Sequence, residues 1–146
     1  MKSIFQRIQV LHLALLGGQV IFGGVVYFLA ADIESNIEED VFVLVVPLLL
    51  LSGMGAGLFL FKQKVAQAKT LEGFEAKMNG YFVAALLRMA LLEGPVIFAF
   101  AAYLLTESIM FWGMGLGGVL LFLVLRPQAG QVAHELGLSL EERANL

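Results

Sequence analysis

Four long apolar segments, separated by short polar ones, dominate the pattern of this 146-residue chain. They cover roughly residues 8–30, 41–61, 81–105 and 109–125. About 20 apolar residues in a helix cross a hydrocarbon layer of about 30 Å, so the first three segments are long enough to span a bilayer. The fourth is at the lower limit and is expected to cross nearly upright or to extend into its flanks. The pattern predicts an all-α, polytopic membrane protein with four transmembrane helices.

The composition agrees with membrane insertion. Hydrophobic residues make up 60% of the chain and charged residues only 14%, and a soluble protein of this length could not enclose four such helices. The first segment is longer than the apolar region of a signal peptide, so we expect it to stay in the fold. The absence of cysteine excludes disulfides and iron sites held by thiolates.

Positive charge is distributed unevenly along the chain. The nine Lys and Arg residues precede the first segment, lie between the second and third, begin the third or follow the fourth: Lys2, Arg7, Lys62, Lys64, Lys69, Lys77, Arg88, Arg126 and Arg143. The loop between the first two segments is acidic and has no basic residue: Asp32, Glu34, Glu38, Glu39 and Asp40. The positive-inside rule then predicts a bacterial inner-membrane protein with both termini and the middle loop in the cytoplasm.

The third segment contains a near copy of the first. Arg88–Phe98 repeats His12–Phe22 at an offset of 76 residues, including the Ala-Leu-Leu and Val-Ile-Phe steps. We therefore expect one membrane domain of two parallel two-helix repeats, related by an axis along the membrane normal. The expected parts are repeat 1 at 1–62, a cytoplasmic connecting segment at 62–80, repeat 2 at 81–127 and a cytoplasmic tail at 128–146.

The two cytoplasmic segments also carry helical patterns. Leu71, Phe74 and Met78 recur at helical spacing, which predicts an amphipathic helix that lies on the surface or extends the third span. Ser139 and Glu142 match a capping box, which predicts a short helix in the tail. Both segments are candidate contacts for a cytoplasmic or membrane protein partner.

Glycines recur within the apolar segments. In a bilayer, glycine lets helix backbones approach closely, and two glycines four residues apart share one helix face. We assign helix packing to Gly17, Gly18, Gly53, Gly57, Gly113 and Gly117. Such faces predict a homo-oligomer.

Glu93 is the strongest candidate for a functional residue. It lies close to the middle of the third segment, where a carboxylate is costly unless it is paired, hydrated or protonated. Desolvation favours the neutral, protonated form of a carboxyl group. One hypothesis is a reversible proton or cation site. The alternative is a neutral or ion-paired residue that holds helices together, with Arg88 or His12 as its partner.

Three further polar residues are candidate modulators of Glu93. Arg88 is about 7.5 Å from Glu93 along the helix and rotated by about 140°, so it either extends to the headgroups or pairs with Glu93 of a neighbouring protomer. His12 aligns with Arg88 in the repeat and either titrates near neutral pH or forms a hydrogen bond between helices. Gln19 shares a polar stripe with Gln9 and His12, which indicates contact between helices.

The sequence offers little for other chemistry. The glycine runs lack the strand and the Lys-Ser/Thr step of a phosphate-binding loop, and two distant histidines do not form a metal site. No nucleophile–base pair and no basic–aromatic face for nucleic acid is visible. We therefore expect no enzyme, cofactor, metal or nucleic-acid partner.

The segment Ala90–Phe98, with its single carboxylate, resembles the ion-binding helix of the c-subunit proteolipids of rotary ATPases. Alternate glycines in 53–57 and 113–117 are similar to the glycine-rich helix of the four-span type. The resemblance implies that Glu93 is the proton site and that Gly17 stands where a second carboxylate was lost. The order of the two helices in each hairpin is reversed here. The chain also looks like small uncharacterised four-span bacterial membrane proteins, which implies no activity.

Two functions are consistent with these patterns. The first is a proteolipid-like protein that binds or translocates protons or cations at Glu93. The second is a non-catalytic structural or accessory membrane subunit in which Glu93 is a packing or ion-pair residue.

Overall fold

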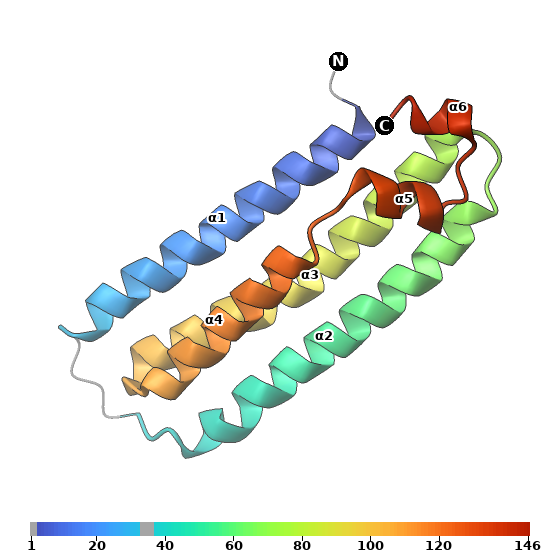
Figure 1. Cartoon of the computed structure of the whole chain (residues 1–146). Coiled ribbons are helices and arrows are strands. Elements are labelled where there is room, and N and C mark those ends of the chain that lie inside the picture. The colour runs from blue at the N-terminus through green and yellow to red at the C-terminus, as the bar shows by residue number, and fades with distance from the viewer. Residues whose placement is uncertain (1–2, 33–36) are drawn as a thin grey trace.

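The computed structural model describes residues 3–32 and 37–146, and every regular element in them is a helix. Figure 1 shows four long helices and two short ones: α1 (Ile4–Ala30), α2 (Asp40–Lys69), α3 (Phe74–Thr106), α4 (Ile109–Val124), α5 (Ala129–Glu135) and α6 (Leu140–Arg143). Helices α1, α2 and α3 are each long and apolar enough to cross a membrane. Helix α4 reaches that length only together with α5, from which it is bent by 73°. The expected all-α membrane protein is confirmed, with three to four candidate spans.

Helix α3 is the centre of the bundle. It packs against α1, α2 and α4, whereas α1 and α2 make few contacts with each other (Figure 1). Helices α3 and α4, by contrast, pack closely as a hairpin. The two hairpins, α1–α2 and α3–α4, are therefore packed differently although their sequences are related by the repeat. Twelve residues of α3 are buried, more than in any other described helix, as expected for the helix with the most neighbours.

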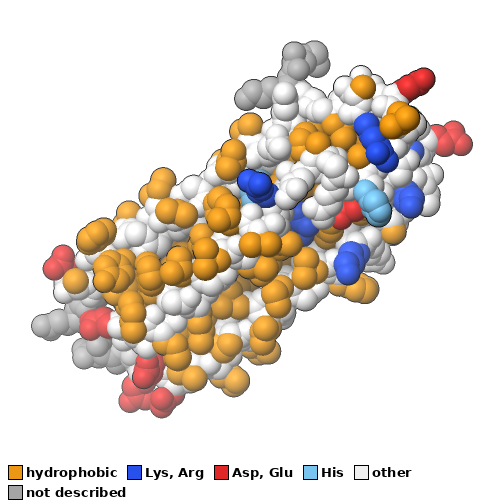
Figure 2. Space-filling view, viewed as in Figure 1, with side chains coloured by type: hydrophobic (Ala, Val, Ile, Leu, Met, Phe, Trp, Pro, Cys, Tyr) orange, Lys and Arg blue, Asp and Glu red, His pale blue; other side chains and the backbone are white. Residues whose placement is uncertain are grey.

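Both termini and the α2–α3 turn lie at one end of the bundle (Figure 1). The hydroxyl of Ser3 donates a hydrogen bond to the carbonyl of Leu146 over 3.3 Å. Lys and Arg side chains gather toward this end, whereas acidic side chains but no basic ones are visible at the opposite end (Figure 2). Lys2 and Glu34, which contributed to the predicted charge pattern, lie outside the described residues.

The connecting segment expected at 62–80 is mostly part of the long helices. Helix α2 continues to Lys69 and α3 begins at Phe74, so only residues 70–73 separate them. Gly73 has φ +86°, a left-handed conformation that glycine adopts without steric cost. Of the two predicted forms, the extension of the third span is therefore the one observed, and α3 begins seven residues before 81.

The tail folds back onto the end that carries the termini. The capping box predicted from Ser139 and Glu142 is present at the start of α6, and the backbone N–H of Ser139 donates to the Glu142 carboxylate over 2.8 Å. This bond, aided by nearby Lys77, holds the pKa of Glu142 below its ordinary value. Helix α5 was not predicted. It forms because Val132 and Leu136 can be buried in the core.

Candidate functional site

Glu93 lies in α3 with 19 residues of the helix before it and 13 after it. Its side chain is partly buried. Within the described residues it has no hydrogen bond and no ion pair. In particular, Arg88 does not pair with it within this chain.

Helical geometry places Glu93 on the side of α3 that faces α1. Phe100 follows Glu93 by seven residues, so the two side chains point within about 20° of each other and are about 10.5 Å apart along the axis. The Phe100 ring packs against Gly23 of α1 and also against Gly115 of α4, since an added Cβ at either glycine would be 2.7 Å from the ring. Glu93 therefore lies on the side of α3 toward α1 and α4, two turns closer to the basic end.

Gln19 occupies the same interface from the α1 side. It is 0% exposed, and neither its amide nitrogen nor its amide oxygen has a hydrogen-bond partner in residues 3–32 and 37–146. Gln19 precedes Gly23 by four residues, or about 6 Å of helix. Because α1 and α3 run in the same direction (Figure 1), Gln19 and Glu93 differ by only about 4.5 Å in height along the bundle. Gln19 thus lies between helices, as its polar stripe indicated, but it has no hydrogen bond within the described residues.

His12 lies two turns below Gln19 on the same face of α1. It is 3% exposed, and its ring stacks on Phe122 of α4 with centroids 4.5 Å apart and 13° between the planes. Neither ring nitrogen has a hydrogen-bond partner among the described residues. The imidazole is also close enough to Arg88 for the two to interact electrostatically. His12 and Arg88, which the sequence repeat aligned, therefore lie at a similar level along the bundle and close to each other.

Arg88 is anchored inside the bundle. It is 5% exposed, its Nη2 donates a hydrogen bond to the carbonyl of Leu125 over 3.1 Å, and its guanidinium carbon lies 3.9 Å from the centre of the Phe61 ring. Tyr81 and Glu135 are near enough to act on it electrostatically. Arg88 therefore joins α2, α3 and the end of α4, and its side chain is buried among them.

The predicted packing glycines divide into two groups. Gly53 and Gly57 of α2 face α3, and a Cβ on Gly53 would be 2.5 Å from the carbonyl oxygen of Leu91. The other four have open space where a side chain would be: Gly17, Gly18, Gly113 and Gly117. Close approach instead occurs at four glycines outside the six assigned positions: Gly23, Gly80, Gly115 and Gly118. Only helix phase relative to a known neighbour could have identified them.

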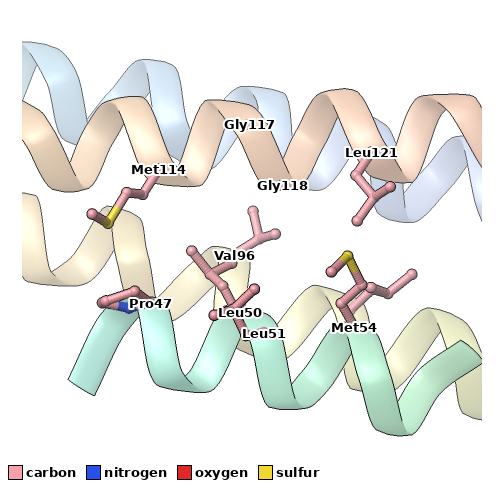
Figure 3. Close-up of a pocket in the computed structure, with 10 residues that line it drawn as sticks. Pro47, Leu50, Leu51, Met54, Val96, Met114, Gly117, Gly118 and Leu121 are labelled. Carbon is pink, nitrogen blue, oxygen red and sulfur yellow. The ribbon is translucent and has the colours of Figure 1, made fainter. Parts of the chain in front are cut away.

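An apolar groove of about 340 Å³ lies between α2, α3 and α4. Figure 3 shows side chains of α2 and α4 pointing toward each other across it, with Val96 of α3 between them. Its described lining contains only apolar side chains and glycine: Pro47, Leu50, Leu51, Met54, Leu92, Val96, Met114, Gly117, Gly118 and Leu121. It offers no group for proton or ion chemistry, so the polar α1–α3 interface is the better candidate.

Comparison of the chain with protein-family models, with curated proteins and with solved structures found no match. Function therefore has to be inferred from the chain's own residues.

Proposed function

We propose that this chain is a four-span protein of the bacterial inner membrane with both termini in the cytoplasm. The gathering of Lys and Arg at the end that holds the termini supports this orientation. The duplicated hairpin in the sequence supports α4 as the fourth span. At 16 residues, α4 is about 24 Å long, and the non-helical residues before α5 complete the crossing.

We further propose that the α1–α3 interface binds or translocates protons or cations at Glu93. One observation carries this proposal: Gln19 and His12 are buried on one face of α1 without a described hydrogen-bond partner, and Glu93, which is partly buried and also has none, lies on α3 nearly level with Gln19. A buried polar group without a partner costs about 1–3 kcal/mol. A packing role would be served better by apolar side chains, whereas a site that takes up a proton, an ion or water needs such groups.

The three residues have distinct roles in this proposal. Glu93 takes and releases the proton or cation. Gln19, nearly level with it, supplies an amide oxygen and an amide N–H to an ion or water beside the carboxylate. His12 and the buried positive charge of Arg88 lie on the path toward the basic end and modulate how readily Glu93 binds its proton.

Proton flux into liposomes tests the proposal. We expect vesicles with the purified protein to acidify under an imposed potential, and Glu93→Gln to abolish this flux because the amide cannot titrate. Glu75→Gln is a matched control, since Glu75 is an exposed residue at the end of the same helix. It should leave the flux unchanged.

Equal flux through the Glu93→Gln and parent proteins would contradict the proposal, provided that both are inserted to the same extent. No flux from the parent protein with any monovalent cation gradient would contradict translocation and leave only binding at Glu93.

The second candidate is a structural or accessory membrane subunit, and the anchoring of Arg88 favours it. The contacts of Arg88 are structural and internal, and Gly113 and Gly117 leave a side of α4 open to another helix. In this case the chain forms a homo-oligomer or binds a membrane partner through α4. Glu93→Gln would then change the oligomeric state or have no effect.

A further inference from the structure

A polar cavity of about 350 Å³ lies beside α1 where the chain leaves α4. Its lining comes from the first turns of α1 and from the segment between α4 and α5: Gln9, His12, Leu13, Arg126, Pro127 and Gln128. The chain turns by 73° between α4 and α5. The cavity therefore lies at the boundary between the apolar layer and the basic end of the bundle.

The chemistry of this cavity suits an anion. Arg126 is exposed and brings a positive charge, Gln9 and Gln128 bring amide N–H groups, and no carboxylate is among its described lining residues. His12 is 97% buried at its wall, and both of its ring nitrogens lack a hydrogen-bond partner in the part of the chain that the structure describes. The Arg88 guanidinium adds a second positive charge near His12.

We propose that this cavity binds the phosphate headgroup of an anionic phospholipid from the cytoplasmic leaflet. The surface beside it accounts for the rest of the lipid. Leu13 of α1 lines the cavity and is 64% exposed, and Leu123 and Val124 at the end of α4 are also exposed. An acyl chain can lie along these side chains while its phosphate contacts Arg126. A soluble phosphate would gain nothing from this apolar surface.

The lipid site is independent of the proposed proton chemistry. It requires neither titration of Glu93 nor any flux, and its residues other than His12 lie outside the α1–α3 interface. The lipid site rests on the proposed orientation of the chain, but absence of proton flux would leave it intact.

Lipid binding can be counted directly. Delipidated protein in a mild detergent is titrated with dioleoylphosphatidylglycerol or dioleoylphosphatidylcholine, and bound lipid is measured by native mass spectrometry. We expect one phosphatidylglycerol to bind at least about fivefold more tightly than phosphatidylcholine, as expected for one basic residue near the headgroup. Arg126→Gln should remove this preference.

Arg7→Gln is the matched control. Arg7 is an exposed arginine near the same end, in α1, and is not among the described residues lining the cavity. Its substitution should leave the preference within about twofold. His12→Phe, which keeps a ring against Phe122, should weaken phosphatidylglycerol binding about threefold or more, because it removes the unpartnered nitrogens.

Two results would overturn the proposal. Equal losses from Arg126→Gln and Arg7→Gln would show that lipid responds only to general surface charge. Displacement of phosphatidylglycerol by millimolar inorganic phosphate would show that the cavity binds a soluble anion and that the apolar surface contributes nothing. Retention of lipid in phosphate, together with loss only in the cavity variants, supports the lipid site.

Discussion

Single residues show two ways of placing a polar group inside an apolar layer. Arg88 is anchored, since its planar guanidinium lies over Phe61 and donates to the carbonyl of Leu125. Gln19 and His12 are similarly buried but have no hydrogen-bond partner within the described residues. The sequence indicated all three positions because polar residues are rare in such segments. It could not show which one is paired, since the partner of Arg88 on α4 is 37 residues away.

The anchoring of Arg88 makes a quantitative prediction. Arg88→Lys keeps the charge but loses the planar contact with the ring, so we expect it to destabilise the fold by about 1–2 kcal/mol. A double-mutant cycle with Phe61→Leu should give a coupling energy of at least about 0.5 kcal/mol. Unfolding in mixed detergent micelles measures both values. Strictly additive effects of the two substitutions would show that the ring and the guanidinium do not interact.

At the scale of elements, close packing of α2 on α3 depends on a glycine. A Cβ at Gly53 would collide with the backbone oxygen of Leu91 and approach Pro95 Cγ to 2.7 Å. The backbone cannot yield as a flexible side chain would, so the two helices must move apart. Gly55 in the same helix has open space around it.

We therefore expect Gly53→Ala to destabilise the protein by about 1–3 kcal/mol. Gly55→Ala should change stability little, since alanine favours the helix and meets no neighbour. The same unfolding measurement compares the two variants. If they are equally stable, the close contact between α2 and α3 is not a constraint on the fold.

Helix boundaries show what a sequence pattern does and does not determine at this scale. Apolar segment length predicted the four long helices, and the capping box at Ser139 predicted α6. The predicted end of α2 was too early and the predicted start of α3 was too late. The reason is that the polar turns beyond the apolar segments remain helical and pack on each other. Helix α5 was missed since its seven residues become stable only against a core made by the other helices.

At the scale of the whole molecule, the distribution of charge along the bundle is the one expected of a membrane protein. The end with both termini gathers the basic side chains, and the face of the bundle seen in Figure 2 is largely apolar between the two ends. The sequence predicted this division from the spacing of Lys and Arg alone. It could not predict that α3 would be central and that α1 and α2 would lie apart. The sequence repeat suggested two equivalent hairpins, whereas only α3 and α4 pack closely on each other.

This arrangement gives Glu93 its proposed role. The central helix carries the one carboxylate at the middle of the apolar layer, and α1 brings Gln19 close to its level. The proposed role requires that the Glu93 carboxyl group be reachable from the bilayer and change its protonation state.

Labelling with an apolar carbodiimide tests that claim most directly. The reagent partitions into lipid and reacts with protonated carboxyl groups, and peptide mass analysis locates the modified residue. In the purified protein in lipid vesicles, we predict selective modification of Glu93 that decreases as the pH rises, because the deprotonated form does not react. Absence of labelling at Glu93 at every pH would contradict the account and leave Glu93 as a residue of structure alone.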